Sequence, residues 1–379
     1  MPFLEEDRVV CDKLLPGLRQ QLAELPLAEL ESESSPAIEI FRARGGTNLL
    51  VPASYGGLDA SPLDAARVLR ALAAQAPSMT VATMMHHFSL GTLFAVAELV
   101  GEGSDLEEIL LRRVVEERLL VASGFAEGRT EQGILSPTMK AEEVPGGYLV
   151  SGAKKPCSLS RSMDLLTASV GITQPDGEIA MGLLMLPADT PGISVHPFWS
   201  TFALAGAESN EVRLTDVLVT PEQIIAPDPS LADAMTELTT VGLIWFQMTV
   251  CAAYTGIASG LVEQVLQRGR GSVGDRAALA VRIESAAALT EGLARRIMDS
   301  DTGNDALAAA LVTRFAVQDA IAATVNQAVE LLGGMAYIGS SDVAYLAAAS
   351  HCIAFHPPSR SSTADGLLDF YLGSPMVVA

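Results

Sequence analysis

The chain has 379 residues and a mass of 39.7 kDa, enough for two or three domains with a sizeable buried core. It carries 45 acidic against 24 basic side chains, a net charge of −21, which argues against a surface that binds nucleic acid. Four scattered cysteines without a CxxC pair predict neither disulfides nor a metal site, and an acidic start in place of a signal peptide predicts a cytoplasmic protein.

The first part of the chain, to about residue 120, has a helical pattern. Apolar residues recur at spacings of three and four, alanine is frequent, and prolines divide the segment into short helices. Ser61-Pro-Leu-Asp64 predicts a capped helix start with proline just inside the cap. His86 and His87 follow on an apolar helix, where neighbours point about 100° apart, so we expect core or cavity-wall residues rather than a metal pair.

Residues 121–228 have a different pattern, with short apolar or alternating runs separated by Pro-Gly and Pro-Asp-Gly turns. These features predict a compact antiparallel β domain. The runs that we expect to form its strands are 148–152, 165–170, 180–186 and 211–219.

From residue 229 to the end, helical periodicity returns. The last long helix should open after Gly303 and close at Gly333 and Gly334, the residues expected at the two caps. The predicted long helices are 231–268, 276–300 and 304–332.

The apolar stretch 241–261 has roughly the length of a membrane span. It contains Gln247 and several hydroxyls, and no basic cluster flanks it. A helix that is apolar on all sides is also typical of a large helical core or a subunit interface. We therefore expect no membrane span here.

Four phrases support a family resemblance, and they follow one another along nearly the whole chain. They are VPASYGGL at 51–58, AEEVPGGYLVSGAKK at 141–155, LAGAESNEVRLTDVLV at 204–219 and ELLGGMAY at 330–337. Together with the order helices, β domain, helices, they resemble the acyl-CoA dehydrogenase family. The resemblance implies an α+β, mostly α fold, with an N-terminal helical bundle (1–120), a central antiparallel β domain (121–228) and a C-terminal four-helix bundle (229–379).

The resemblance implies FAD as the cofactor, with its ring against the β domain. Ser158 falls where the family places a hydroxyl that hydrogen-bonds near flavin N5, although a turn-capping serine is the alternative. Cys157 precedes it. The family's segment along the pyrimidine edge corresponds to Phe125, Ala126 and Glu127. Pro156 stands where the family usually has an aromatic residue, so the ring packing should differ.

The resemblance also implies a second group of cofactor contacts, around the FAD diphosphate. Gly333 and Gly334 can both cap a helix and let the backbone approach a diphosphate closely. Arg268 or Arg270 lies where a family arginine pairs with the diphosphate of the neighbouring subunit. A solvated arginine is the alternative for either.

The family's catalytic base is missing from both of its usual places. Removing a proton beside a thioester requires a carboxylate within reach of the substrate, yet neither 354–360 nor 245–247 contains one. We expect a substitute among four residues, each of which has a surface or structural role as its alternative. They are Glu127, Glu208, Asp365 and His356, the last preceding two prolines and titrating near neutrality.

Three functions remain open from the sequence. The first is oxidation at a CH–CH group of an acyl thioester carried on CoA or an acyl carrier protein, with a relocated base. The second is a flavin monooxygenase or oxidase on the same scaffold, which needs no such base. The third is a non-catalytic subunit. We expect a homodimer or homotetramer that passes electrons to an acceptor flavoprotein or to oxygen.

Overall fold

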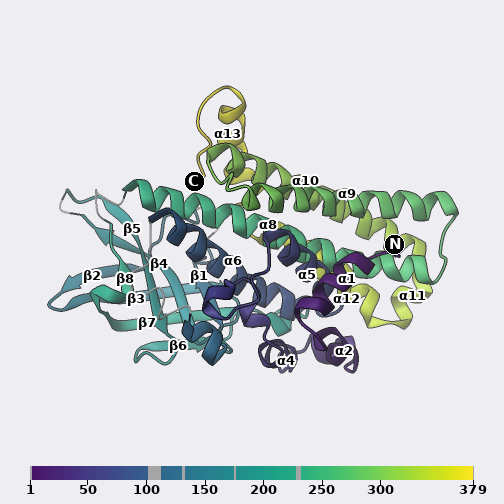
Figure 1. Cartoon of the computed structure of the whole chain (residues 1–379), viewed down its shortest axis with the longest axis horizontal. Helices are drawn as coiled ribbons and strands as arrows, with labels where there is room; N and C mark the ends of the chain where they lie inside the picture. Colours follow the sequence, from purple (N-terminus) through teal and green to yellow (C-terminus); the bar gives the residue numbers. More distant parts are fainter. Residues whose placement is uncertain (1, 101–111, 130–132, 175, 228–231, 379) are drawn as a thin grey trace.

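The computed structural model describes residues 2–100, 112–129, 133–174, 176–227 and 232–378. Figure 1 shows a β domain at one end of an elongated helical body, with the last helix, α13, projecting from one side. The expected order of helices, β domain and helices is confirmed. The boundary that we expected between 228 and 229 lies outside the described residues.

The N-terminal part is helical, and α5 shows how the sequence sets its limits. Ser61 Oγ accepts a hydrogen bond from the Asp64 amide at 3.1 Å, and Pro62 stands just inside this cap, as expected. The helices of this part are α1 (Glu5–Leu14), α2 (Leu18–Ala23), α3 (Leu27–Leu30), α4 (Ala37–Ala43), η1 (Gly46–Asn48), η2 (Ala53–Tyr55), α5 (Pro62–Ala73) and α6 (Pro77–Val100).

The β domain is one eight-stranded sheet in the order β6-β7-β3-β2-β4-β5-β8, with β1 paired to β4. The prediction of a purely antiparallel domain is wrong, since β4 pairs in parallel with both β1 and β2. The short β1, entering directly from the helical part, carries no alternating pattern that could have revealed this pairing. The elements are β1 (Val121–Gly124), β2 (Lys140–Val144), β3 (Gly147–Cys157), β4 (Leu165–Thr173), β5 (Ile179–Pro187), β6 (Ile193–His196), η3 (Ala205–Ala207), β7 (Asn210–Val219), η4 (Pro221–Gln223) and β8 (Ile224–Ile225).

The C-terminal part is helical again, and its three long helices agree with the predicted ranges within a few residues. Gly303 caps the start of α10, and Gly333, with a φ of 82°, caps its end. The elements are α8 (Ala232–Gln267), α9 (Val273–Met298), α10 (Asn304–Leu332), α11 (Gly334–Gly339), α12 (Ser341–His351), η6 (Cys352–Phe355) and α13 (Arg360–Tyr371).

Helix α8 is the centre of the helical body, in contact with α5, α6, α9, α10 and α12. Two helices are long and apolar enough to cross a membrane by length and composition, Met235–Gln267 and Asn304–Leu332. In the first, 89% of the apolar window is buried inside the protein. Such burial is typical of a core helix, the interpretation favoured from the sequence.

Candidate functional site

A hydroxyl pair lies where β3 leaves the sheet. Strand pairing sets Cys157 opposite Asn210, which brings the next residue, Ser158, beside Ser209. The two Oγ atoms are 2.9 Å apart, and both side chains are buried. Ser158 therefore has a hydrogen-bond partner, Ser209, in the residue directly before β7. The sequence did not indicate this pair.

A cleft of about 350 Å³ opens beside this pair, and Ser209 forms part of its wall. The cleft combines an aromatic ring, a cation, polar groups and small apolar side chains, a mixture that suits a planar polar ligand. Its lining residues are Glu33, Arg161, Val195, Pro197, Trp199, Ala205, Ser209 and Asn210.

The two segments predicted to face the flavin ring lie side by side. The Lys155 amide donates to the Ala126 carbonyl at 2.8 Å, and Glu127 forms a parallel bridge with Lys155. The buried thiol of Cys157 points to the Ser123 carbonyl at 3.7 Å, so a ligand would meet the Cys157 backbone rather than its sulfur. The structure thus brings 125–127 and 157–158 into one region.

Glu127 is engaged within the protein. Its carboxylate accepts hydrogen bonds from the Met139 amide at 3.0 Å and from the fully buried ammonium of Lys154 at 2.7 Å, as well as from Thr138. Burial alone would raise the pKa of Glu127, but the bonds from Lys154 and Thr138 outweigh it and lower the pKa to about 2. Such a weak base favours a structural role over proton abstraction.

Glu208 is held in a turn. Its carboxylate accepts bonds from the amides of Arg161, at 3.1 Å, and Ser162, at 2.8 Å, and from the Ser162 hydroxyl at 2.8 Å. These contacts tie the chain after Ser158 to the segment before Ser209. The arrangement favours a positioning role for Glu208. Asp365, the third acidic candidate, lies exposed on α13.

His356 lies in a separate, aromatic environment. Its Nε2 is 2.8 Å from the Tyr254 hydroxyl, and its ring meets those of Phe246 and Tyr254 edge-on. Phe246 in turn contacts Phe88 of α6. Burial, with a smaller contribution from the positive charge of Arg314, lowers the pKa of His356 to about 3. The imidazole is therefore neutral at physiological pH.

Trp245 Nε1 and Gln247 Oε1, on either side of Phe246 in the chain, are among the buried polar atoms that have no hydrogen-bond partner among the described residues. Both side chains are buried, and Gln247 Nε2 lies 3.5 Å from the Pro357 carbonyl, which joins it to the His356 loop. Buried polar atoms without a partner are costly, so these are candidate ligand contacts. Sequence reasoning considered 245–247 only as a place without a carboxylate.

The residues predicted to hold the diphosphate gather elsewhere. Arg268 and Arg270 are exposed in the turn between α8 and α9, and a Cβ on Gly271 of this turn would lie 2.7 Å from Leu331, just before Gly333 and Gly334. Figure 1 places α11, which begins at Gly334, at the opposite end of the molecule from the β domain. The predicted ring contacts and the predicted diphosphate contacts therefore lie toward opposite ends of one subunit.

His86 and His87 are core residues, as expected. The Val121 amide donates to His86 Nδ1 at 3.1 Å, and His86 Nε2 lies 2.8 Å from the Thr47 carbonyl. Burial lowers the pKa of His86 to about 4, so it is a neutral clamp between α6, η1 and β1. No group of three or more His, Cys, Asp or Glu within the described ranges is arranged to hold a metal ion.

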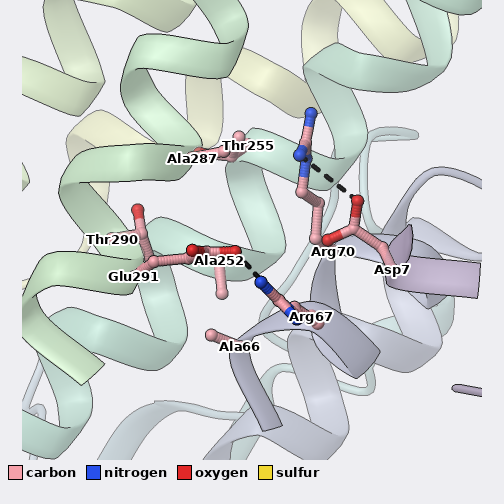
Figure 2. Close-up of a pocket in the computed structure, with 9 residues that line it drawn as sticks. All are labelled: Asp7, Ala66, Arg67, Arg70, Ala252, Thr255, Ala287, Thr290 and Glu291. Carbon is pink, nitrogen blue, oxygen red and sulfur yellow. Dashed lines mark hydrogen bonds and ion pairs between the residues drawn. The ribbon is translucent and has the colours of Figure 1, made fainter. Parts of the chain in front are cut away.

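A second, small pocket lies between α1, α5, α8 and α9, and Figure 2 shows its charged lining. Its volume, about 10 Å³, suits a single water molecule. Arg70 pairs with Asp7 at 3.3 Å, which joins α5 to α1, and Arg67 pairs with Glu291 at 2.9 Å, which joins α5 to α9. This pocket is too small for a substrate.

The cleft residues fit an isoalloxazine. Trp199 offers a flat apolar surface, Ser209, which is hydrogen-bonded to Ser158, offers a hydroxyl for the polar edge of a ring, and Arg161 offers a positive charge for a phosphate. We had identified Ser158 from the resemblance, but Trp199, Arg161 and Ser209 were missed. Trp199 is one of only two tryptophans in the chain, which was the one signal available.

The sequence is similar to that of characterised enzymes. It is 50% identical over 378 residues to isobutylamine N-hydroxylase from Streptomyces viridifaciens, a match that covers 100% of both chains. It is also 23% identical over 357 residues to cyclohex-1-ene-1-carbonyl-CoA dehydrogenase from Geobacter metallireducens, covering 89% of this chain and 90% of the relative. No protein-family model matches the chain.

Solved structures share the fold. FMN-bound TdsC from Paenibacillus sp. A11-2 superposes with a TM-score of 0.83 at 17% identity, covering 99% of both chains. A nitrososynthase from Micromonospora carbonacea var. africana superposes with a TM-score of 0.81 at 22% identity, covering 98% of both chains. The expected fold class is confirmed, with the sheet corrected from antiparallel to mixed.

Proposed function

Because the chain belongs to the family of isobutylamine N-hydroxylase, flavin-dependent oxidoreductases on the acyl-CoA dehydrogenase scaffold, we propose that it N-hydroxylates a small primary aliphatic amine. The observation that carries this proposal is the 50% identity to that enzyme over the full length of both chains. It favours the oxygenase function over acyl-thioester dehydrogenation, our first expectation.

The geometry supports the same choice. A dehydrogenase of this fold needs a carboxylate free to take a proton beside a thioester. Glu127 and Glu208 accept several hydrogen bonds each, and Asp365 lies exposed on α13. An oxygenase needs no such base, because the lone pair of a neutral amine is itself the nucleophile.

The aromatic group around His356 suits an uncharged amine. The rings of Phe88, Phe246 and Tyr254 exclude water, and the neutral imidazole places no positive charge there. Gln247 Oε1 can accept a hydrogen bond from an N–H group. A reduced flavin would supply the two electrons with which one oxygen atom of O₂ enters the N–H bond and the other leaves as water.

For the cofactor we propose FAD bound across two subunits. The cleft at Ser158 would take the ring, and the exposed turns at Arg268–Arg270 and Gly333–Gly334 of a neighbouring copy would take the diphosphate. Large apolar side chains stand exposed close to those turns, with Met335 at 81% and Ile338 at 80% exposure. A second copy of this chain would cover these side chains. We propose that the protein assembles in this way in the cytoplasm.

A direct assay tests the reaction. The purified protein, FAD, NADH and an added flavin reductase are incubated aerobically with isobutylamine, and N-isobutylhydroxylamine is measured by mass spectrometry. We expect product only when amine, oxygen and reductase are all present. Omission of the protein is the control, because free reduced flavin consumes oxygen without binding the amine.

A second assay tests the competing function. Flavin-loaded protein is mixed anaerobically with a panel of acyl-CoA and acyl-carrier-protein thioesters while the flavin absorbance is followed. We expect no bleaching, because Glu127 and Glu208 are engaged in several hydrogen bonds and Asp365 lies exposed on α13. Rapid bleaching by one thioester, together with no hydroxylamine in the first assay, would indicate that the protein is an acyl-thioester dehydrogenase.

A further inference from the structure

One buried peptide group, between the cleft residues Trp199 and Ala205 in the chain, is hydrogen-bonded on both sides. The carbonyl of Ala203 accepts a hydrogen bond from Trp199 Nε1 at 2.8 Å. The amide of Leu204, which belongs to the same peptide unit, donates to the Tyr345 hydroxyl at 3.0 Å. The Tyr345 hydroxyl therefore holds the peptide that orients the Trp199 indole.

The Tyr345 hydroxyl is itself fixed by a buried polar cluster. It donates to the carboxylate of Glu31, which also accepts the Ser78 hydroxyl at 2.5 Å and the Ser78 amide at 3.0 Å. Glu31, Ser78 and Tyr345 are 4%, 0% and 9% exposed. Their positions after α3, at the start of α6 and in α12 mean that the cluster joins both helical parts to the β domain at Leu204.

The segment held by this cluster needs such support. Leu204 and Glu208 have φ values of 60° and 54°, a left-handed conformation that is uncommon for residues other than glycine. Gly206, between them, lies so close to the helical part that a Cβ would sit 2.9 Å from the Ser32 carbonyl. Ser209, which meets Ser158, follows directly.

We propose that Tyr345, anchored by Glu31, is a positioning residue for the cofactor: it fixes the segment 203–209 and thereby sets Trp199 and Ser209 in the cleft wall. Tyr345 does not line the cleft itself, and it lies in a different part of the chain from every residue that does. The inference rests on the proposed assignment of the cleft to the flavin.

Tryptophan fluorescence provides a readout that a purely structural role would not change. The chain has two tryptophans, so Trp245→Phe leaves Trp199 as the single emitter. Because Trp245 Nε1 is itself a candidate ligand contact, the FAD affinity of this background is measured first and serves as the reference. In this background, Tyr345→Phe is compared with Tyr371→Phe, a matched control whose ring is 68% exposed on α13. Acrylamide quenching reports the exposure of Trp199, and FAD titration reports the dissociation constant.

We expect Tyr345→Phe to leave the Leu204 amide without its acceptor. Trp199 should then be quenched by acrylamide about twofold more strongly, and the dissociation constant for FAD should rise by about tenfold. The control should change neither quantity. If Tyr345→Phe has a native circular dichroism spectrum and matches the control in both quantities, the proposal is overturned.

A milder variant covers the case in which Tyr345→Phe does not fold. Burial raises the pKa of Glu31 to about 7, so this variant is compared with its parent above pH 8, where Glu31 is charged. There Glu31→Gln keeps the Tyr345 hydroxyl but replaces its charged acceptor with a neutral one, and charge-assisted bonds are about twice as strong as neutral ones. We expect the dissociation constant for FAD to rise about threefold and amide hydrogen exchange at residues 203–209 to accelerate. Unchanged exchange and unchanged affinity would overturn the proposal.

The cleft assignment is tested in parallel with Ser158→Ala in the same background. Weaker FAD binding in Ser158→Ala with normal binding in Tyr345→Phe would refute only the role of Tyr345. Normal binding in both variants would refute the cleft as the flavin site and the role of Tyr345 with it.

Discussion

Ser158 is the residue on which the proposed cofactor site depends most. It lies 2.9 Å from Ser209 Oγ, at the end of β3 and beside the cleft. We predict that Ser158→Ala raises the dissociation constant for FAD by roughly tenfold and shifts the flavin absorption bands, because a hydrogen bond to the ring is lost. Fluorescence titration measures this. Ser194→Ala is the control, since that exposed hydroxyl bonds to His196, and equal affinities for the two variants would count against the site.

Glu127 has a structural task that its removal should reveal. It is paired with Lys154, which is fully buried, so Glu127→Ala leaves a buried cation without its partner. We predict a loss of roughly 3–5 kcal/mol in the free energy of unfolding, measured with urea, and a smaller loss when Lys154→Met is added.

The sign of the pH effect at Glu127 follows from its lowered pKa. The contribution of Glu127 to the free energy of unfolding is fully present above the ordinary pKa of a glutamate, and it is lost as the pH falls toward the lowered pKa of about 2. Glu117→Ala, which removes an exposed ion pair with Arg113, should leave stability unchanged. A Glu127→Gln variant with wild-type stability and no turnover would instead point to a catalytic carboxylate.

At the scale of elements, the buried Glu31 joins the end of α3 to Ser78 of α6 and Tyr345 of α12. This carboxyl group should make the free energy of unfolding depend on pH near neutrality. Burial raises the pKa of Glu31 to about 7, although the Ser78 and Tyr345 hydroxyls oppose this. The folded protein therefore holds a proton that the unfolded chain has lost, and stability falls as the pH rises from about 4.5 to about 7.

We predict that this fall, on the order of 3 kcal/mol for Glu31, is absent in Glu31→Gln. Thermal or urea unfolding at several pH values measures it. Asp7, whose pKa burial raises to about 6, contributes a fall of the same sign in both proteins, so the difference between them isolates Glu31. Parallel stability curves would contradict the prediction.

The sequence predicted the limits of helices and strands better than the contacts between them. The limits of α10 follow from Gly303 and Gly333, whose cap roles are local. The parallel pairing of β1 with β4 and the bond from Leu204 to Tyr345, 141 residues away, depend on contacts that no local pattern encodes. Ser158 was found through a family phrase, whereas Trp199 had no phrase to mark it.

At the scale of the whole molecule, the proposed cofactor site needs two subunits. Gly333 and Gly334 lie at the far end of the helical body from Ser158, so one copy would supply the ring site and another the diphosphate site. We predict that Arg268→Ala combined with Arg270→Ala weakens the binding of FAD by about tenfold and weakens the binding of FMN much less, because FMN lacks the adenylate half.

Paired titrations with FAD and FMN measure this difference, and light scattering checks that the variant keeps the oligomeric state of the wild type. Arg282→Ala, which removes a bond to Gln327 between α9 and α10, is the matched control. An equal loss for both cofactors, or a wild type that prefers FMN, would contradict binding across subunits.

The most direct test of the proposed oxygen transfer follows the oxygen atom. The protein, FAD, NADH and a flavin reductase are incubated with isobutylamine under ¹⁸O₂ in ordinary water, and the product is analysed by mass spectrometry. We expect a hydroxylamine that carries one ¹⁸O atom. A product without the label, or no oxidised amine from a flavin-loaded and folded protein, would contradict this expectation.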